Sequence, residues 1–102
     1  MAHADITTKV MVENINHPGK TTTVDKTRYE AMRKAILKVL PKRSPGMTPD
    51  DIYRAVLPIL PETVFSGGDR AGWWTKCVQL DLEAKGLIVR DRKTKPLRLT
   101  RA

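Results

Sequence analysis

The chain has 102 residues, which is the length of one compact domain and too short for two. Its hydrophobic fraction of 40% predicts a folded core and argues against intrinsic disorder. The formal net charge is +8, an excess that favours polyanionic partners such as nucleic acid. Solubility alone is the alternative explanation, because net charge bears on non-specific association and not on fold.

Cysteine content and targeting segments bear on the compartment. Cys77 is the one cysteine, so no internal disulfide can form and a reducing compartment is expected. The first residues lack the basic stretch followed by an apolar one that is typical of a signal peptide. The apolar runs are far shorter than the ~20 residues that span a bilayer. We therefore expect a cytoplasmic protein with no membrane partner.

Charge is unevenly distributed along the chain. Residues 1–24 are neutral overall, residues 25–45 carry a net charge of +5, residues 46–69 carry −3 and residues 70–102 carry +6. Two basic segments therefore flank an acidic one. Any basic surface must come from the first and last parts of the fold.

Residues 1–24 favour extended structure. Two β-prone runs, residues 9–13 and 21–24, flank the turn signal His17-Pro18-Gly19. This pattern predicts either a β-hairpin or a mobile arm, since chain termini are often poorly ordered.

Two helices are predicted next. The first covers residues 26–40, with Asp25 as its cap and Pro41 as its end. The second begins at Thr48-Pro49-Asp50-Asp51, where the threonine caps the helix and proline takes the first helical position. Pro58 ends it, because proline cannot continue a helix.

A third helix and a hairpin complete the chain. The helix starts after a cap at Asp69 or Ser66, runs to about Lys85 and stops at Gly86. Two strands, residues 87–90 and 97–101, are joined by the charged turn 91–95. Pro96 marks the second strand as an edge strand, since proline has no N–H to donate.

The order of three helices and a hairpin resembles that of the winged helix-turn-helix superfamily. Residues 80–90 resemble the end of the third helix and the start of the wing in that superfamily; their sequence is Leu-Asp-Leu-Glu-Ala-Lys-Gly-Leu-Ile-Val-Arg. Leu82 lies four residues before Gly86, at the turn from the third helix into the wing. The resemblance covers residues 25–101. It implies a mainly α fold with small β: a winged-helix domain over 25–102, with three helices and a C-terminal β-hairpin wing, and an extended N-terminal arm or hairpin over 1–24.

The whole chain is also similar to uncharacterised small bacterial proteins. They share the Asn-His-Pro-Gly turn and the segment Trp-Trp-x-Lys-x-x-Gln-Leu-Asp-Leu-Glu-Ala-Lys-Gly. This similarity implies no activity, and fold alone does not specify one.

In winged helices the third helix can enter the major groove of DNA while the wing contacts the backbone. Taking Val78 as inward and 100° per residue, we expect Gly72, Lys76, Gln79 and Glu83 to be exposed. Lys76 suits a guanine edge and Gln79 an adenine edge. Arg70 adds a cation at the helix start. Contacts dominated by phosphate are favoured over base readout, because Asp81 and Glu83 add negative charge to the same helix.

The wing is the second candidate contact. Its cations form a plausible phosphate clamp; they are Arg90, Arg92, Lys93 and Lys95, followed by Arg98 and Arg101. The alternative is an edge that charge protects from strand pairing. The first helix and its end add further cations, Arg28, Arg33, Lys34, Lys38, Lys42 and Arg43. We interpret these as an ordinary solvated face.

Trp73 and Leu80 lie seven residues apart, on the side of the third helix away from Val78. One interpretation is that the N-terminal hairpin covers them. The alternatives are a dimer or partner surface, since exposed aromatic side chains mark interfaces, and base stacking by Trp73.

Catalysis is not indicated. His3 and His17 lie in the N-terminal segment, and with Cys77 alone they give no metal site of familiar spacing. Gly67 and Gly68 belong to no nucleotide-binding loop pattern. We expect no enzyme, no cofactor, no metal and no small-molecule substrate. The leading hypothesis is nucleic-acid binding, to double-stranded DNA, by the third helix and the wing; the alternative is a protein-interaction or homodimerisation module of the same fold.

Overall fold

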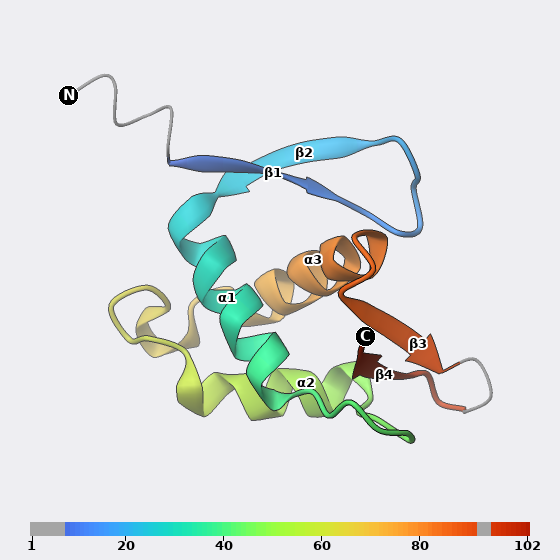
Figure 1. Cartoon of the computed structure of the whole chain (residues 1–102). Helices are drawn as coiled ribbons and strands as arrows, with labels where there is room; N and C mark the ends of the chain where they lie inside the picture. The colour runs from blue at the N-terminus through green and yellow to red at the C-terminus, as the bar shows by residue number, and fades with distance from the viewer. Residues whose placement is uncertain (1–7, 92–94) are drawn as a thin grey trace.

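The computed structural model describes residues 8–91 and 95–102. It contains three α-helices and two antiparallel hairpins, so the predicted mainly α fold with small β is confirmed, in a layout consistent with a winged helix-turn-helix (Figure 1). The elements are β1 Lys9–Glu13, β2 Thr21–Asp25, α1 Lys26–Val39, α2 Pro49–Val56, the short 3₁₀ turns η2 Leu57–Ile59 and η3 Ser66–Gly68, α3 Ala71–Ala84, β3 Ile88–Asp91 and β4 Arg98–Arg101.

The N-terminal segment forms a hairpin that belongs to the core. Strands β1 and β2 pair with Met11 opposite Thr23, and the hairpin crosses above α1 and α3 (Figure 1). Val12 and Val24 are its buried side chains, at 2% and 7% exposure. Of the two predicted forms, residues 9–25 therefore adopt the hairpin.

The first two helix starts are confirmed. The carboxylate of Asp25 accepts a hydrogen bond from the N–H of Arg28 at 2.8 Å, and Oγ1 of Thr48 accepts one from the N–H of Asp51 at 3.1 Å. These bonds satisfy amide groups that have no partner within a helix. Pro49 occupies the start of α2, where a missing N–H costs nothing.

The predicted cap of α3 is wrong. Arg70 holds the N-cap position with a left-handed backbone (φ 56°), and no side chain caps the helix. Asp69 instead pairs with the guanidinium of Arg28 at 3.4 Å. The predicted helix end is confirmed, because Gly86 follows the cap residue Lys85 with φ 76°.

The hydrophobic core lies between the three helices and is closed by both hairpins. All three helices, the loop before α3 and the β3–β4 hairpin contribute fully buried side chains: Met32 and Ile36 from α1, Ile52 and Val56 from α2, Phe65 from the loop, Val78 and Leu82 from α3, and Ile88 and Leu99 from β3 and β4. Because each element buries one face against the others, the hairpins and helices form one packing unit.

Asp81 is a fully buried carboxylate that joins three elements. It accepts hydrogen bonds from the N–H of Glu13 at 2.8 Å and from the hydroxyl of Tyr29 at 2.5 Å. Nζ of Lys85 donates to both of its oxygens, at 2.7 and 2.8 Å. Burial, and then the bond to Asp81, raise the pKa of Tyr29, so the phenol remains a donor at neutral pH. Burial opposes the charge of Lys85, but its bond to Asp81 prevails and raises its pKa.

The loop between α1 and α2 adds to the wing. The N–H of Met47 donates to the carbonyl of Leu99 at 2.9 Å, and the N–H of Leu99 donates to the carbonyl of Met47 at 2.8 Å. The chain approaches so closely that a Cβ on Gly46 would lie 2.2 Å from the carbonyl oxygen of Leu99. Strand β4 is therefore held from both sides, by β3 and by this loop.

Candidate functional site

The C-terminal half of α3 is buried on nearly every side. Gln79 is 1% exposed and Glu83 is 7% exposed, so the prediction that they face solvent is wrong. The hairpin covers one side of this half, because the N–H of Ile15 donates to the carbonyl of Leu80. On another side Arg90 of the wing donates to the carboxylate of Glu83. Gln79 donates to Glu83 as well, at 3.0 Å. The helical-wheel prediction from Val78 took no account of these contacts, because the hairpin and Arg90 lie outside α3.

Arg90 is paired and not free. The hydrogen bond to Glu83 is the main cause of its raised pKa, and the pair lies partly buried between α3 and β3. Its charge is therefore largely compensated within the protein. Among the predicted wing cations, Lys95 is exposed, whereas Arg92 and Lys93 lie outside the described residues.

The N-terminal half of α3 keeps an open surface. Lys76 is exposed, as predicted, Arg70 is exposed as well, and Trp73 is 57% exposed. The Trp73 ring meets the buried Trp74 edge to face, with centroids 5.2 Å apart. Leu80 is 8% exposed, so the hairpin covers Leu80 but leaves Trp73 open.

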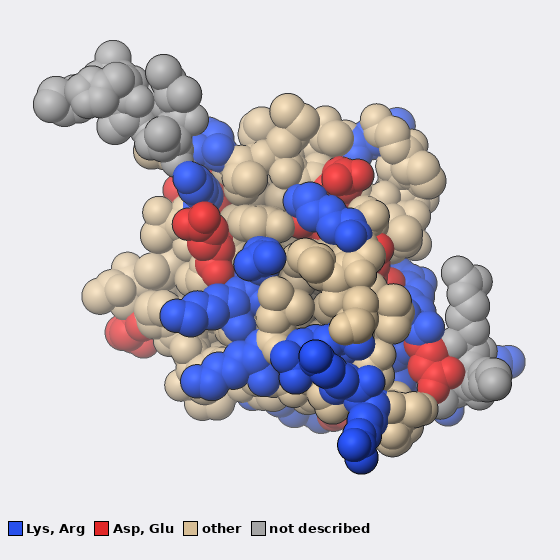
Figure 2. All heavy atoms as spheres, in the orientation of Figure 1, with Lys and Arg blue, Asp and Glu red and all other residues tan. Residues whose placement is uncertain are grey.

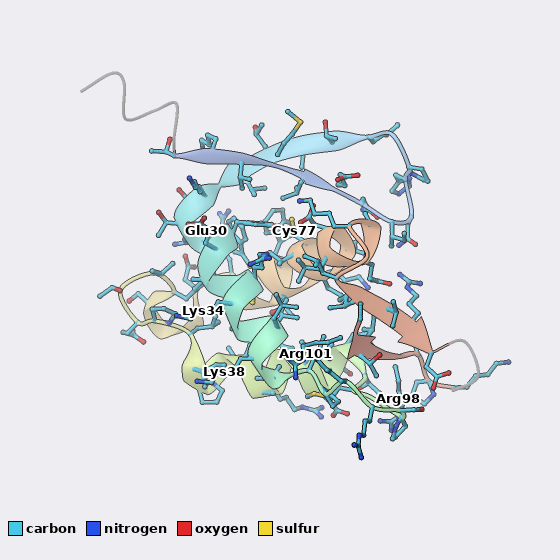
Figure 3. All side chains as sticks on the ribbon, in the orientation of Figure 1. Glu30, Lys34, Lys38, Cys77, Arg98 and Arg101 are labelled. Carbon is cyan, nitrogen blue, oxygen red and sulfur yellow. The ribbon has the colours of Figure 1, made fainter. Side chains whose placement is uncertain are left out.

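A basic face is formed by side chains of α1 and β4 (Figure 3). Lys34 and Lys38 of α1 and Arg98 and Arg101 of β4 follow one another across it (Figure 3). The space-filling view shows a nearly continuous band of Lys and Arg over the lower half of this side, while acidic side chains lie at its margins (Figure 2). Within the described part of the chain, none of the four makes an ion pair with a carboxylate.

The two arginines of the basic face are held in place by backbone carbonyls. Nη1 of Arg98 donates to the carbonyl of Gly46 at 3.0 Å, and Nε of Arg101 donates to the carbonyl of Leu40 at 2.8 Å. A carbonyl fixes the side chain without neutralising it, and each guanidinium has five N–H donors, so most remain for a ligand. Lys34 and Lys38 are one helical turn apart, and both are exposed.

Sequence reasoning assigned these cations to two separate groups. The i, i+4 spacing of Lys34 and Lys38 and the positive charge of residues 25–45 were the available signals. The pairing of β4 with the loop after α1 brings Arg98 and Arg101 beside the two lysines, and no local pattern predicts that pairing.

No helix in the described ranges has the length and apolarity needed to cross a bilayer.

The fold and its surfaces define a small, basic, mainly helical domain with two antiparallel hairpins. Residues 9–99 match the model of a family of unknown function (DUF6958), and the chain belongs to this family. No curated protein and no solved structure matches the chain. The family description names no activity, so a functional hypothesis rests on the chemistry of the two exposed surfaces.

Proposed function

We propose that this protein is a variant winged-helix protein that binds duplex DNA through its basic face. One observation carries the proposal: Lys34, Lys38, Arg98 and Arg101 converge from α1 and β4 on one face, with no carboxylate pairing among the described residues. Unpaired cations gathered on one side are the electrostatic footprint of a phosphate-binding surface.

The binding mode differs from that of a reading helix. Gln79 is buried and Arg90 is paired, so α3 offers few groups for base edges. Arg70 and Lys76 remain accessible and would add phosphate contacts only if the duplex reached that side. The wing contributes in this proposal through Arg98 and Arg101 of β4, and α1 contributes through its lysines. Contacts of this type position DNA but carry little sequence information. Neither a metal nor a cofactor is required.

Salt dependence of DNA binding tests the proposal. Phosphate contacts release counterions, so four to six contacts predict an affinity loss of about 10²–10³ between about 50 and 200 mM salt. The measurement is the anisotropy of a fluorescent duplex titrated with the native protein at both salt concentrations. A scrambled duplex of the same length should bind equally well. A duplex that shows no binding at about 50 mM salt with about 100 μM protein contradicts the proposal.

A further inference from the structure

The two outer edges of the N-terminal hairpin differ in what they contact. The N–H of Lys26 donates to the carbonyl of Thr8 at 2.7 Å, which makes residues 8 and 26 a hydrogen-bonded pair of the antiparallel ladder. Because such pairs alternate, the N–H and C=O groups of Thr22 and Val24 face β1, and those of Thr21 and Thr23 face outward. At the end of the β1 edge, α3 takes the outward N–H groups: that of Glu13 donates to Asp81, and that of Ile15, just after the strand, donates to Leu80.

The outward edge of β2 is open. Thr21, Thr22 and Thr23 are exposed, and within the described residues β1 is the one strand that pairs with β2. Natural edge strands are often blocked by lysine, proline or a bulge. This strand consists of three threonines, a valine and Asp25 at its end; the first four favour strand structure and do not obstruct another strand, and the carboxylate of Asp25 caps α1.

Two hollows line this edge, with Trp73 between them. The first, about 350 Å³, lies between the hairpin and α3: residues 12–14 of β1 and the turn and Thr21 and Thr22 of β2 border it on one side, and Trp73, Cys77 and Leu80 of α3 on the other. The second follows Thr23 and Val24 to Trp73 and Trp74. A strand added to β2 would direct alternate side chains into these hollows, against the exposed face of Trp73.

The charges around the hollows favour an acidic occupant. Lys20 and Lys76 line the first hollow, and Arg28 and Arg70 line the second. The acids in the linings are Glu13 and Asp25, and the carboxylate of Asp25 already caps α1. Asp69 pairs with Arg28, so Lys20, Lys76 and Arg70 are the cations that carry the excess of positive charge.

A second copy of the chain fits less well than an acidic segment. Each copy carries a net charge of +8, so association of two copies brings like charges together. Antiparallel pairing of two β2 strands about Thr23 would also set Lys20 opposite Lys26 of the other copy at both ends. Like charges directly opposite each other destabilise a strand pair.

We propose that β2 and Trp73 form a docking site for an extended acidic segment of a partner protein, bound by strand addition. The segment has acidic residues at its ends and β-branched or apolar residues that face Trp73. Backbone hydrogen bonds to Thr21 and Thr23 supply affinity, and the hollows and flanking cations select the sequence. This site is separate from the basic face and does not depend on DNA binding.

A capped heptapeptide, Glu-Val-Thr-Val-Thr-Val-Glu, is the first probe. We expect it to shift the backbone amide signals of Thr21 and Thr23 and the indole signal of Trp73 in NMR spectra of the native protein. The same peptide with lysine at both ends should bind at least about tenfold more weakly, because charge complementarity discriminates between partners. Absence of shifts with about 1 mM acidic peptide, or equal binding of the lysine peptide, overturns the proposal.

Matched variants test the strand-addition geometry. Thr23→Pro removes an outward N–H and leaves the ladder to β1 intact, whereas Thr23→Val keeps the N–H. We expect at least about tenfold weaker peptide binding for Thr23→Pro and for Trp73→Ala, and unchanged binding for Thr23→Val. Met11→Ala is the control for Trp73, because Met11 is an equally exposed apolar side chain (60%) on the outer face of the hairpin.

Changes made in the peptide keep the test independent of protein folding. N-methylation of the peptide amides that would face β2 removes their donors and should abolish binding to the native protein. Full binding of the methylated peptide contradicts strand addition.

Two other results would identify a different occupant. Self-association of the native protein that is abolished by Thr23→Pro would identify a second copy of the chain. Binding of a single-stranded oligonucleotide more tightly than the peptide would identify base stacking, if Trp73→Ala weakens this binding and Thr23→Pro leaves it unchanged. Either result overturns the proposal.

Discussion

Replacement of Asp81 by alanine should lower the free energy of unfolding by about 3–5 kcal/mol, the largest loss we expect from a single substitution in this chain. The carboxylate is fully buried and accepts bonds from Glu13, Tyr29 and Lys85. Its removal leaves an amide, a phenol and an ammonium group without their partner in or near the core, and unpaired buried polar groups are costly. Urea unfolding followed by circular dichroism measures the loss.

Two further variants provide reference values for the loss of stability expected of Asp81→Ala. Asp69→Ala breaks an exposed ion pair with Arg28, whose side chains are 56% and 30% exposed, and should cost less than about 1 kcal/mol. Tyr29→Phe removes only one bond to Asp81 and should cost about 1–2 kcal/mol, which remains measurable if Asp81→Ala does not fold. A loss below about 1 kcal/mol for Asp81→Ala would mean that Asp81 does not fix the hairpin on α3.

The second large effect concerns DNA binding. The double variant Lys34→Glu with Lys38→Glu should weaken duplex binding by more than about 100-fold at low salt and reduce the salt slope by about two. Both lysines are exposed on α1 and make no ion pair among the described residues, so their replacement should leave the fold intact. Fluorescence anisotropy with the same labelled duplex provides the measurement.

The matched control is Lys9→Glu with Lys20→Glu on the N-terminal hairpin. It changes the net charge by the same amount but leaves the basic face unaltered, and both lysines are exposed. We expect it to weaken binding by less than about tenfold through long-range electrostatics alone. Equal losses in the two double variants would show that net charge, and not the basic face, governs binding.

Local signals in the sequence predicted the secondary structure well. The caps at Asp25 and Thr48 and the stop at Gly86 depend on residues within one helical turn, so they are visible in the sequence itself. The cap of α3 was wrong because Asp69 has a distant partner, Arg28, that competes for its carboxylate. Val78, the residue of the third helix assumed to point inward, is fully buried.

The functional surfaces were harder to predict because they depend on contacts between distant segments. Gln79 and Glu83 lie on the polar side of an isolated α3, but both are buried in the folded chain, where Arg90 of β3 donates to Glu83. The sequence Leu80-Asp81-Leu82, with Lys85 four residues after the acid, was a signal for a buried ion pair. Arg98 and Arg101 join the basic face only because β4 contacts the loop after α1.

The most direct test of the central claim is to map the DNA-binding surface of the native protein by NMR. Titration of a ¹⁵N-labelled sample with a short duplex should shift the amides of Lys34 and Lys38 and the side-chain Nε signals of Arg98 and Arg101, while the signals of Gln79 and Trp73 remain in place. A duplex that shifts the signals of Arg70, Trp73 and Lys76 and leaves the basic face unchanged would contradict the account and assign DNA binding to α3.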